Sequence, residues 1–379
     1  MKKSKHKHPS IVIGGYYGYG SMGDDAVLRS ILEGISKRMA GACVTVLSAD
    51  KDSVPSFDSI SVRSASRTNP LSLASLLFRS DIFISGGGTL LQDSTSKRSL
   101  FYYTFLIRLA KLCRTKIYIY ANGIGPLNDP SRLYPVLRLA DRISVRDPDS
   151  LLLAREICKN STPIYLTADP VFTCPIKKSA DDTLKKKHSV SMYFAVSLRQ
   201  CAAGKINTER LERVIRAQKA KGLLPVFVSM QDSYDRDMCE KLARKTGGTV
   251  ADINNIDELF CLLENASFAI GMRLHFLLCA LMCETPTVAL SYDTKVKSCV
   301  SYLGSPYILD AFSFSVSSAL RAIDMAIRDL ETVRRTKINC EKMRALADED
   351  MDELTALACQ SCGATAKKQR SREKFFADT

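Results

Sequence analysis

His275 is the residue of this sequence best placed for acid–base chemistry. It follows Gly271-Met272-Arg273-Leu274, where an expected strand ends and an expected helix begins. The other three histidines lie in charged stretches, two near the N-terminus and one beside a run of lysines. Histidine titrates near neutral pH, and a helix N-terminus with an arginine binds anions, so Arg273 and His275 predict an anion site with a group suited to acid–base chemistry. A buried histidine with a structural partner is the alternative.

Two further basic residues follow expected strands in the second half of the chain. Arg199 comes after the strand expected at 192–197, and Lys295 comes shortly after the strand expected at 287–290. With Arg273 and His275 they form a cationic set suited to a small anion that carries several charges. For Lys295, solvation at the surface is the alternative to neutralising a phosphate or carboxylate.

A glycine-rich segment follows the first expected strand and ends in two carboxylates. Residues 18–23 fit G-x-G-x-x-G, and Asp50 lies near the end of the next strand, which is a dinucleotide-binding pattern. Asp24 and Asp25 disfavour that ligand, because they stand where a pyrophosphate would meet the helix N-terminus and would repel it. Either aspartate can instead bind a sugar hydroxyl or act as a base. For Asp24, capping of the helix is the alternative.

Three consecutive glycines follow the third expected strand. Gly86, Gly87 and Gly88 stand between a strand and a helix, where they expose backbone N–H groups and let a ligand approach closely. Gln92 and Asp93 come shortly afterwards and add polar groups suited to a hydroxyl-rich sugar. This segment therefore predicts a ligand-facing loop.

Other strand ends give weaker signals. Residues 122–126 form a second glycine turn after a strand, and Arg146-Asp147 and Asp169-Pro170 each follow a strand. We expect the last two pairs to be structural.

Short apolar strands alternate with amphipathic helical patterns along the chain. The expected strands are 10–13, 44–47, 82–85, 117–120, 143–145 and 164–166 in the first half, and 192–197, 225–229, 268–270 and 287–290 in the second. This alternation is typical of parallel sheets covered by helices on both faces. It predicts an α/β protein with two Rossmann-like domains facing a cleft, and the candidates above follow the carboxyl ends of strands, where such sheets bind ligands.

The expected organisation has six parts. They are a basic, disordered tail at 1–9, an N-terminal α/β domain on the acceptor side at 10–176, a polar linker at 177–189, a C-terminal α/β domain on the donor side at 190–312, helices that pack back at 313–362, and a second basic, disordered tail at 363–379.

Composition narrows the class of protein. A chain of 379 residues with 46% hydrophobic content suits two globular domains. No apolar run reaches the ~20 residues that span a bilayer, and no signal-peptide core is evident, so we expect a cytoplasmic protein. The net charge of +14 is partly carried by the tails, which allows a peripheral contact with the inner face of the membrane. The chain shows no basic-aromatic motif of a nucleic-acid module, and we expect no nucleic-acid partner.

The thirteen cysteines are scattered, as free thiols are in a reducing compartment. Cys359 and Cys362 form a C-x-x-C, but no second pair completes a zinc site. The sequence predicts no metal and no cofactor, and it leaves the oligomeric state open.

Four motifs together resemble the polysaccharide pyruvyl transferases, and the bacterial branch that modifies secondary cell-wall polymers is the most similar type. They are Gly14-Gly15-Tyr16-Tyr17-Gly18-Tyr19-Gly20-Ser21-Met22-Gly23-Asp24-Asp25-Ala26, Ser85-Gly86-Gly87-Gly88-Thr89-Leu90-Leu91-Gln92-Asp93, Gly271-Met272-Arg273-Leu274-His275 and Ser291-Tyr292-Asp293-Thr294-Lys295-Val296.

The resemblance implies a two-domain fold similar to the glycosyltransferase B type. It implies phosphoenolpyruvate as the donor and an N-acetylmannosamine-like sugar, often lipid-linked, as the acceptor. Arg199, Arg273 and Leu274 would lie near the donor, and His275 would be the acid. The product would be a pyruvate ketal, with release of phosphate.

Three alternatives stay open at this point. A nucleotide-sugar glycosyltransferase would share the fold, and a dinucleotide oxidoreductase would bind NAD. A non-catalytic relative would bind a glycan or an anion without turnover.

Overall fold

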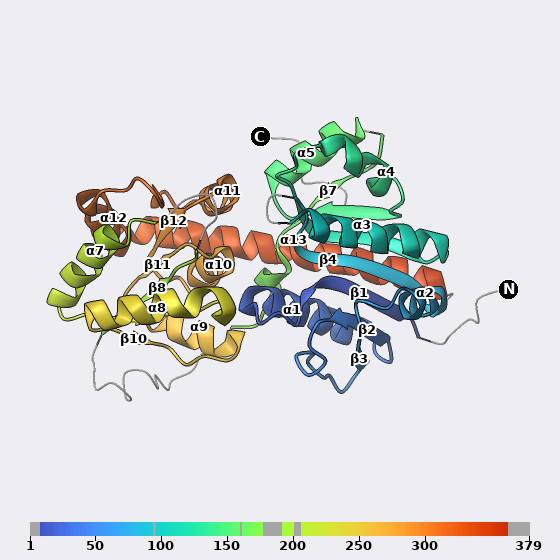
Figure 1. Cartoon of the computed structure of the whole chain (residues 1–379), viewed down its shortest axis with the longest axis horizontal. Helices are drawn as coiled ribbons and strands as arrows, with labels where there is room; N and C mark the ends of the chain where they lie inside the picture. Colours follow the sequence, from blue (N-terminus) through green and yellow to red (C-terminus); the bar gives the residue numbers. More distant parts are fainter. Residues whose placement is uncertain (1–7, 94–95, 160, 177–191, 201–205, 363–379) are drawn as a thin grey trace.

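The structure is a computed structural model and describes residues 8–93, 96–159, 161–176, 192–200 and 206–362. It contains two parallel β-sheets, one from each half of the chain, which lie beside each other along the long axis (Figure 1). This confirms the predicted α/β class with two Rossmann-like sheets. The predicted linker at 177–189, the tail at 363–379 and most of the tail at 1–9 lie outside the described residues, so the predicted domain limits stay predictions.

The first sheet has seven strands in the order β3-β2-β1-β4-β5-β6-β7. The strands are β1 (Ser10–Tyr17), β2 (Cys43–Ser48), β3 (Ser61–Ala65), β4 (Ile82–Leu91), β5 (Lys116–Ile124), β6 (Arg142–Val145) and β7 (Tyr165–Leu166). The helices are α1 (Met22–Arg38), α2 (Pro70–Arg79), α3 (Lys97–Leu112), α4 (Tyr134–Leu137) and α5 (Pro148–Cys158), with 3₁₀ turns η1 (Pro130–Leu133) and η2 (Pro170–Thr173). Strands β1, β4 and β5 are almost wholly buried, as expected for a parallel sheet with helices on both faces.

The second sheet has six strands in the order β10-β9-β8-β11-β12-β13. The strands are β8 (Tyr193–Ser197), β9 (Leu224–Phe227), β10 (Thr249–Val250), β11 (Ala269–Gly271), β12 (Thr287–Ser291) and β13 (Ile308–Asp310). The helices are α7 (Thr208–Ala220), α8 (Asp232–Thr246), α9 (Ile256–Glu264), α10 (Leu274–Met282), α11 (Thr294–Tyr302), α12 (Val316–Arg328) and α13 (Leu330–Cys362).

The order of the strands reverses once in each sheet, between β1 and β4 in the first and between β8 and β11 in the second. At such a point the connections leave in opposite directions and open a ligand site at the carboxyl ends of the strands. The segments that follow β1, β8 and β11 include Asp24, Arg199 and His275, and Gly88 lies within β4 near its carboxyl end. The topology therefore gathers the predicted site residues from distant parts of the sequence.

Strand β4 is longer than predicted. The expected strand ends at residue 85, but β4 continues to Leu91, so the three glycines lie within the strand and not in a loop after it. Gly86 pairs with Tyr120 and Gly88 with Asn122 of β5, while φ is +65° at Gly87 and +97° at Gly88. Glycine tolerates these angles without strain, which lets the backbone turn locally and still stay in the sheet.

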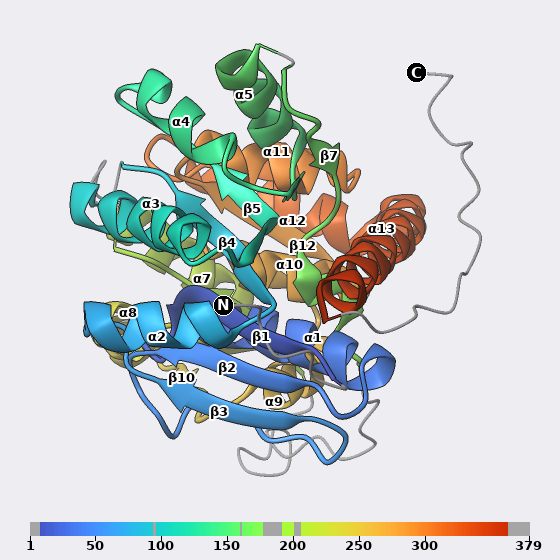
Figure 2. The same ribbon diagram turned by 90° about the vertical axis from the view of Figure 1, so that its right-hand side faces the viewer.

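The two faces of the first sheet are covered by different helices. Buried residues of α2 and α3 pack on one face with Val12 and Phe83. Buried residues of α1 and α13 pack on the other face with Ile11 and Ile13. Figure 2 shows α2 and α3 on the side of the molecule opposite α13.

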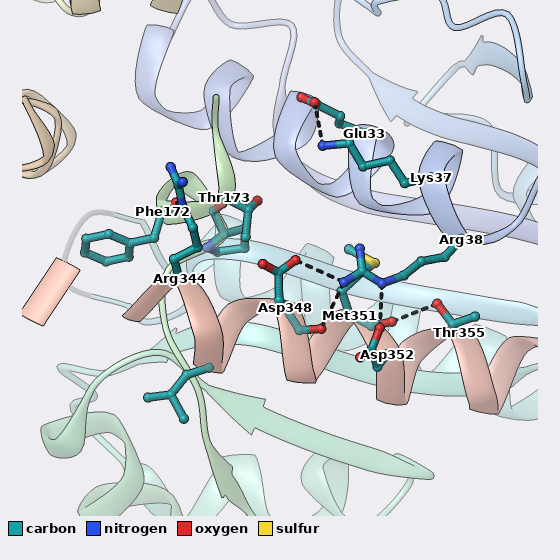
Figure 3. A network of polar contacts seen from close by, with 12 residues as sticks. Glu33, Lys37, Arg38, Phe172, Thr173, Arg344, Asp348, Met351, Asp352 and Thr355 are labelled. Atoms are coloured by element: carbon teal, nitrogen blue, oxygen red, sulfur yellow. Dashed lines mark hydrogen bonds and ion pairs between the residues drawn. The ribbon is translucent and has the colours of Figure 1, made fainter. Parts of the chain in front are cut away.

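Helix α13 runs along both halves (Figure 1) and packs against α10 of the second and against α1 and η2 of the first. Its Asp350 is buried and accepts hydrogen bonds from the hydroxyl groups of Tyr118 on β5 and Ser144 on β6. Arg38 of α1 lies between the carboxylates of Asp348 and Asp352 (Figure 3). These contacts fasten the end of the chain to the first sheet.

Candidate functional site

His275 lies in the first turn of α10 and contacts elements of the first half. Its side chain is 14% exposed, and its Nε2 lies 3.4 Å from Oδ2 of Asp169. The ring also packs against Gly23 of α1, because a Cβ built on Gly23 would lie 2.2 Å from Nδ1 of His275. Nε2 is buried and has no hydrogen-bond partner among the described residues. The imidazole is thus held between Asp169 and Gly23, both of the first half of the chain.

A buried ion pair lies beside this imidazole. Arg146 follows β6 and Asp169 precedes η2, and their side chains are 6% and 5% exposed. Arg146 donates hydrogen bonds to Asp169 Oδ2 and, over 2.9 Å, to the hydroxyl of Thr89. Burial alone raises the pKa of Asp169, but Arg146 and His275 outweigh it and hold the pKa well below its usual range. Asp169 therefore stays ionised beside the imidazole.

Arg146 and Asp169, which the sequence predicts to be structural, both lie beside His275 in the structure. A signal for this position was present in the sequence, since Arg146 directly follows β6 and Asp169 comes shortly after β7. This signal was ambiguous, because polar residues at the start of a helix often have a structural role as caps. Asp169 does accept a hydrogen bond from the N–H of Val171 over 3.0 Å, as a cap of η2.

Asp24 and Asp25 lie in different surroundings although they are neighbours on α1. Asp24 accepts a hydrogen bond from Ser21, and burial raises its pKa, although His275 and Arg146 lower it in part. Burial and the charge of Asp24 raise the pKa of Asp25 to about 6, and its backbone contact is to Gly18. The helix begins after Ser21, which is the N-cap residue, so the hypothesis that Asp24 caps it is wrong. Asp24 is the carboxylate nearer the imidazole.

The glycines of β4 divide between the core and the site. Gly86 accepts a hydrogen bond from the Tyr17 hydroxyl over 2.7 Å, and a Cβ on Gly87 would lie 2.1 Å from Val27. A Cβ on Gly88 would lie 3.2 Å from Oδ1 of Asp24. Gly88 therefore borders Asp24, whereas Gly86 and Gly87 pack against buried side chains.

The predicted cations of the second half do not form one cluster. Arg273 donates two hydrogen bonds to the fully buried Asp235 of α8, over 2.8 and 2.6 Å. Arg199 donates one to the hydroxyl of Tyr292 over 2.8 Å and lies over its ring. Lys295 lies elsewhere, beside Arg146.

Lys295 links the two halves of the chain. Its ammonium group donates a hydrogen bond to the carbonyl of Gly125, at the end of β5. Burial, and then the nearby charge of Arg146, lower the pKa of Lys295 to about 8. At neutral pH it is still mostly protonated, so the half-buried Lys295 places a second positive charge beside Arg146.

The remaining predicted residues lie at the margin. Asp93 accepts a hydrogen bond from the N–H of Asn128 over 3.0 Å and shapes the turn after β5, and Gln92 directly follows β4. Leu274 lines a small cavity of about 20 Å³ with Arg146 and Asp169. It therefore supplies an apolar wall behind the ion pair.

A cluster of tyrosines around Arg67 was not predicted. Arg67 is 9% exposed, and its guanidinium carbon lies 5.0 Å from the ring centre of Tyr19 and 4.7 Å from that of Tyr102. Its Nη2 is 3.4 Å from the hydroxyl of Tyr103, whereas Nη1 is buried without a hydrogen-bond partner among the described residues. Tyr19 also stacks on Tyr16, with ring centres 4.4 Å apart. We call these five residues the Arg67 cluster.

The Arg67 cluster adjoins the acid–base residues. Burial raises the pKa of Tyr103, and the negative charge of Asp24 nearby raises it further. Charged aromatic surroundings of this kind suit a sugar ring with an anionic substituent. Arg67 is a single arginine outside any recognisable motif, so the sequence alone did not predict its role.

Within the described ranges, no three His, Cys, Asp or Glu side chains are grouped as metal ligands. In the same part of the chain, none of the helices is both long enough and apolar enough to cross a bilayer.

Solved structures of nucleotide-sugar enzymes share this fold. Staphylococcus aureus MnaA, solved with UDP, is 11% identical with a TM-score of 0.63, and the match covers 95% of this chain and 99% of that one. Anabaena HepE, solved with UDP and glucose, is 12% identical with a TM-score of 0.54, covering 93% and 98%. At such identities the likeness establishes the fold alone, and it confirms the expected similarity to glycosyltransferase B enzymes. A comparison with curated protein sequences finds no match.

One protein family matches at the level of sequence. Its description is "Polysaccharide pyruvyl transferase", and the match extends from residue 22 to residue 294, well over half of the chain. The matched range contains Asp24, Arg146, Asp169 and His275.

Proposed function

The chain belongs to the polysaccharide pyruvyl transferase family, and from this premise we propose that it transfers the enolpyruvyl group of phosphoenolpyruvate to a sugar. The acceptor in this proposal is a sugar of a cell-surface polysaccharide, or of its lipid-linked precursor. The product is a cyclic pyruvate ketal, and inorganic phosphate is released.

The cations around His275 support phosphoenolpyruvate as the donor. Arg146 is buried and Lys295 is half-buried beside it, with the carboxylates of Asp169 and Asp147 close by. A small anion that carries both a phosphate and a carboxylate would form charge-assisted hydrogen bonds with two neighbouring cations of this kind. Arg199 and Arg273 lie in the neighbouring cluster with Asp235 and Tyr292, where we assign them to positioning.

The proposed reaction proceeds by two additions at one carbon. Protonated His275 donates a proton to C3 of the enolpyruvyl group, which becomes a methyl group and leaves C2 as an oxocarbenium-like centre. A sugar hydroxyl loses its proton to Asp24 and bonds to C2. The C2–O bond to phosphate then breaks, a second hydroxyl bonds to C2, and its proton leaves with the phosphate.

The environments of His275 and Asp24 suit these roles. The acid stands beside an ionised Asp169 that orients it, while burial raises the pKa of Asp24 toward the range of a general base. The Arg67 cluster borders Asp24, so we place the acceptor sugar there, with tyrosine rings against its apolar face and Arg67 toward an anionic substituent.

The observation that carries the proposal is the position of the His275 imidazole, whose Nε2 lies 3.4 Å from the ionised Asp169 and whose Nδ1 side faces Gly23 of the opposite half. We therefore expect phosphate release from phosphoenolpyruvate that depends on both an acceptor saccharide and His275. In His275→Asn the rate falls by on the order of 10²–10⁴-fold, because asparagine keeps the packing and loses the acid. The assay measures phosphate release with a panel of lipid-linked and soluble acceptors.

Two arms of that assay separate the alternatives. UDP-sugars in place of phosphoenolpyruvate test a nucleotide-sugar transferase, and the proposal fails if only they are consumed. A second outcome against the proposal is an unchanged rate in the asparagine variant. His8→Asn, a histidine remote from His275 in the sequence and packed against Gly41, is the matched control.

A further inference from the structure

The outer helices of the first sheet, α2 and α3, have a one-sided charge. Neither helix contains an acidic residue. Together they carry five basic residues, all exposed: Arg79, Lys97, Arg98, Arg108 and Lys111. A surface of ordinary composition mixes both signs, so this pair of helices is selective for a negatively charged partner.

Large apolar side chains stand among these charges. Leu71 is 83% exposed and Phe78 47% on α2, while Phe101 is 68% and Leu112 81% exposed on α3. Leu71 and Phe78 are seven residues apart, and Phe101 and Leu112 are eleven apart, which places each pair along one side of its helix. Both helices bury their other side in the same core on the same face of the sheet, so the two exposed stripes lie on the same side of the molecule. Figure 2 shows α2 and α3 on the side opposite α13.

The basic residues at the start of α3 are not explained by the fold. Lys97 and Arg98 occupy the first turn, where positive charge opposes the helix dipole and costs stability. Lys97, Arg98 and Arg108 make no ion pair with a residue in the described ranges. Their charges are therefore available to an external partner.

We propose that the face formed by α2 and α3, which we call the α2–α3 face, binds the surface of an anionic phospholipid bilayer. Exposed phenylalanine and leucine insert at the boundary between headgroups and acyl chains, and arginine and lysine bind the lipid phosphates. The four exposed apolar side chains favour a bilayer over a nucleic acid as the partner. They can insert among the lipids of a bilayer, whereas a nucleic acid in water offers them no apolar surface on the phosphate backbone.

The face lies close to the proposed acceptor site. Helix α3 begins five residues before Tyr102, and Tyr102 and Tyr103 belong to the Arg67 cluster. A saccharide carried on a membrane lipid would therefore reach the acid–base residues while the α2–α3 face stays on the bilayer. This last link rests on the proposed function, whereas membrane binding itself does not.

Vesicle co-sedimentation of the full chain tests the proposal. We expect binding to vesicles of phosphatidylglycerol and phosphatidylcholine, loss of binding with phosphatidylcholine alone, and weakening by salt. Lys97→Gln/Arg98→Gln/Arg108→Gln and, separately, Phe101→Ser/Leu112→Ser each reduce the partition coefficient by roughly tenfold or more. Both variants retain the wild-type melting temperature within a few degrees, because every changed side chain is exposed.

The matched control lies on α12 of the second half. Arg321→Gln/Met325→Ser/Arg328→Gln also removes exposed basic and apolar groups, Met325 being 51% exposed, and leaves vesicle binding unchanged. Three outcomes overturn the proposal: equal loss in this control, binding of a single-stranded RNA oligonucleotide in place of vesicles, or self-association through the α2–α3 face in sedimentation velocity.

The same variants distinguish this proposal from the proposed function. With a soluble acceptor, phosphate release by the α3 variants equals that of the wild type, and with a vesicle-borne acceptor it falls. Vesicle binding without any phosphate release means that the surface is correct and the reaction is wrong.

Discussion

At the scale of single residues, the site depends on how closely the imidazole of His275 approaches the first half. Gly23 lies in α1 with ordinary helical geometry, so its backbone angles do not require a glycine. The neighbouring His275 requires it, because a methyl group on residue 23 would overlap the imidazole ring. The position of His275 therefore depends on the lack of a side chain at Gly23 as much as on the contact with Asp169.

Gly23→Ala therefore displaces His275 while leaving the helix intact. Alanine has a higher helix propensity than glycine, so the substitution does not destabilise α1 itself and the melting temperature does not fall for that reason. We expect a loss on the order of 10²-fold in kcat, as a misplaced catalytic group gives, with KM for phosphoenolpyruvate less affected. Steady-state kinetics and a thermal melt check this, and an unchanged kcat would show that the ring position does not matter.

Lys295 sets a second prediction, on pH. Its pKa is lowered to about 8, so it loses its charge as the pH rises through 8 and with it the attraction for an anionic donor. We expect KM for phosphoenolpyruvate to rise above pH 8. In Lys295→Arg the group stays charged and this rise disappears. The measurement is kcat/KM from pH 6 to 9.5, and persistence of the rise in the arginine variant would contradict the assignment.

At the scale of elements, the last helix carries a buried acid whose charge the fold disfavours. Burial raises the pKa of Asp350 to about 6, against an ordinary value of 3.8, despite hydrogen bonds from Tyr118 and Ser144. The folded protein therefore binds this proton more tightly than the unfolded chain. The stability it contributes is complete below pH 4 and is lost as the pH rises to 6.

Asp350→Asn removes that dependence on pH. The amide keeps the shape and carries no charge, so the free energy of unfolding of the variant falls less between pH 4 and 6 than that of the wild type. Urea unfolding at several pH values measures the difference. Asp348→Asn, a half-buried residue of the same helix that pairs with Arg38, is the control, and parallel curves for wild type and Asp350→Asn would refute the prediction.

The sequence predicted most elements because their apolar periods are clear. The short strands β3, β10 and β13 were not predicted, whereas the other strands of the two sheets were placed. Strand β4 was cut short, since glycine favours a loop locally and only pairing with β5 keeps it extended. The site was predicted in part. His275 and Asp24 followed strands with unusual chemistry, but the pairing of Arg273 with Asp235 and the approach of Arg146 to His275 depend on contacts between distant segments. No local pattern carries that information.

At the scale of the whole molecule, the two sheets share one apolar core. Buried residues of both halves, among them Ile13, Phe276 and Met351, belong to one continuous cluster, and α13 packs against both. Across the interface, Met22 N–H donates to the carbonyl of Met230 over 3.0 Å, and Arg29 pairs with Asp257 at 3.0 Å.

Such a shared core predicts that the halves unfold together. We expect one calorimetric transition, with equal calorimetric and van't Hoff enthalpies. Ala347→Asp, which buries an unpaired charge in α13, lowers the midpoint without splitting the transition. Two resolved transitions in either protein would mean that the halves are independent.

In the proposed mechanism the acid and the base come from opposite sides of this interface, since His275 belongs to α10 and Asp24 to α1. That mechanism predicts that neither half produced alone contains a complete catalytic site. A fragment released by proteolysis, or a nascent chain whose second sheet has yet to form, would then hold no centre at which the proposed donor could be consumed without an acceptor.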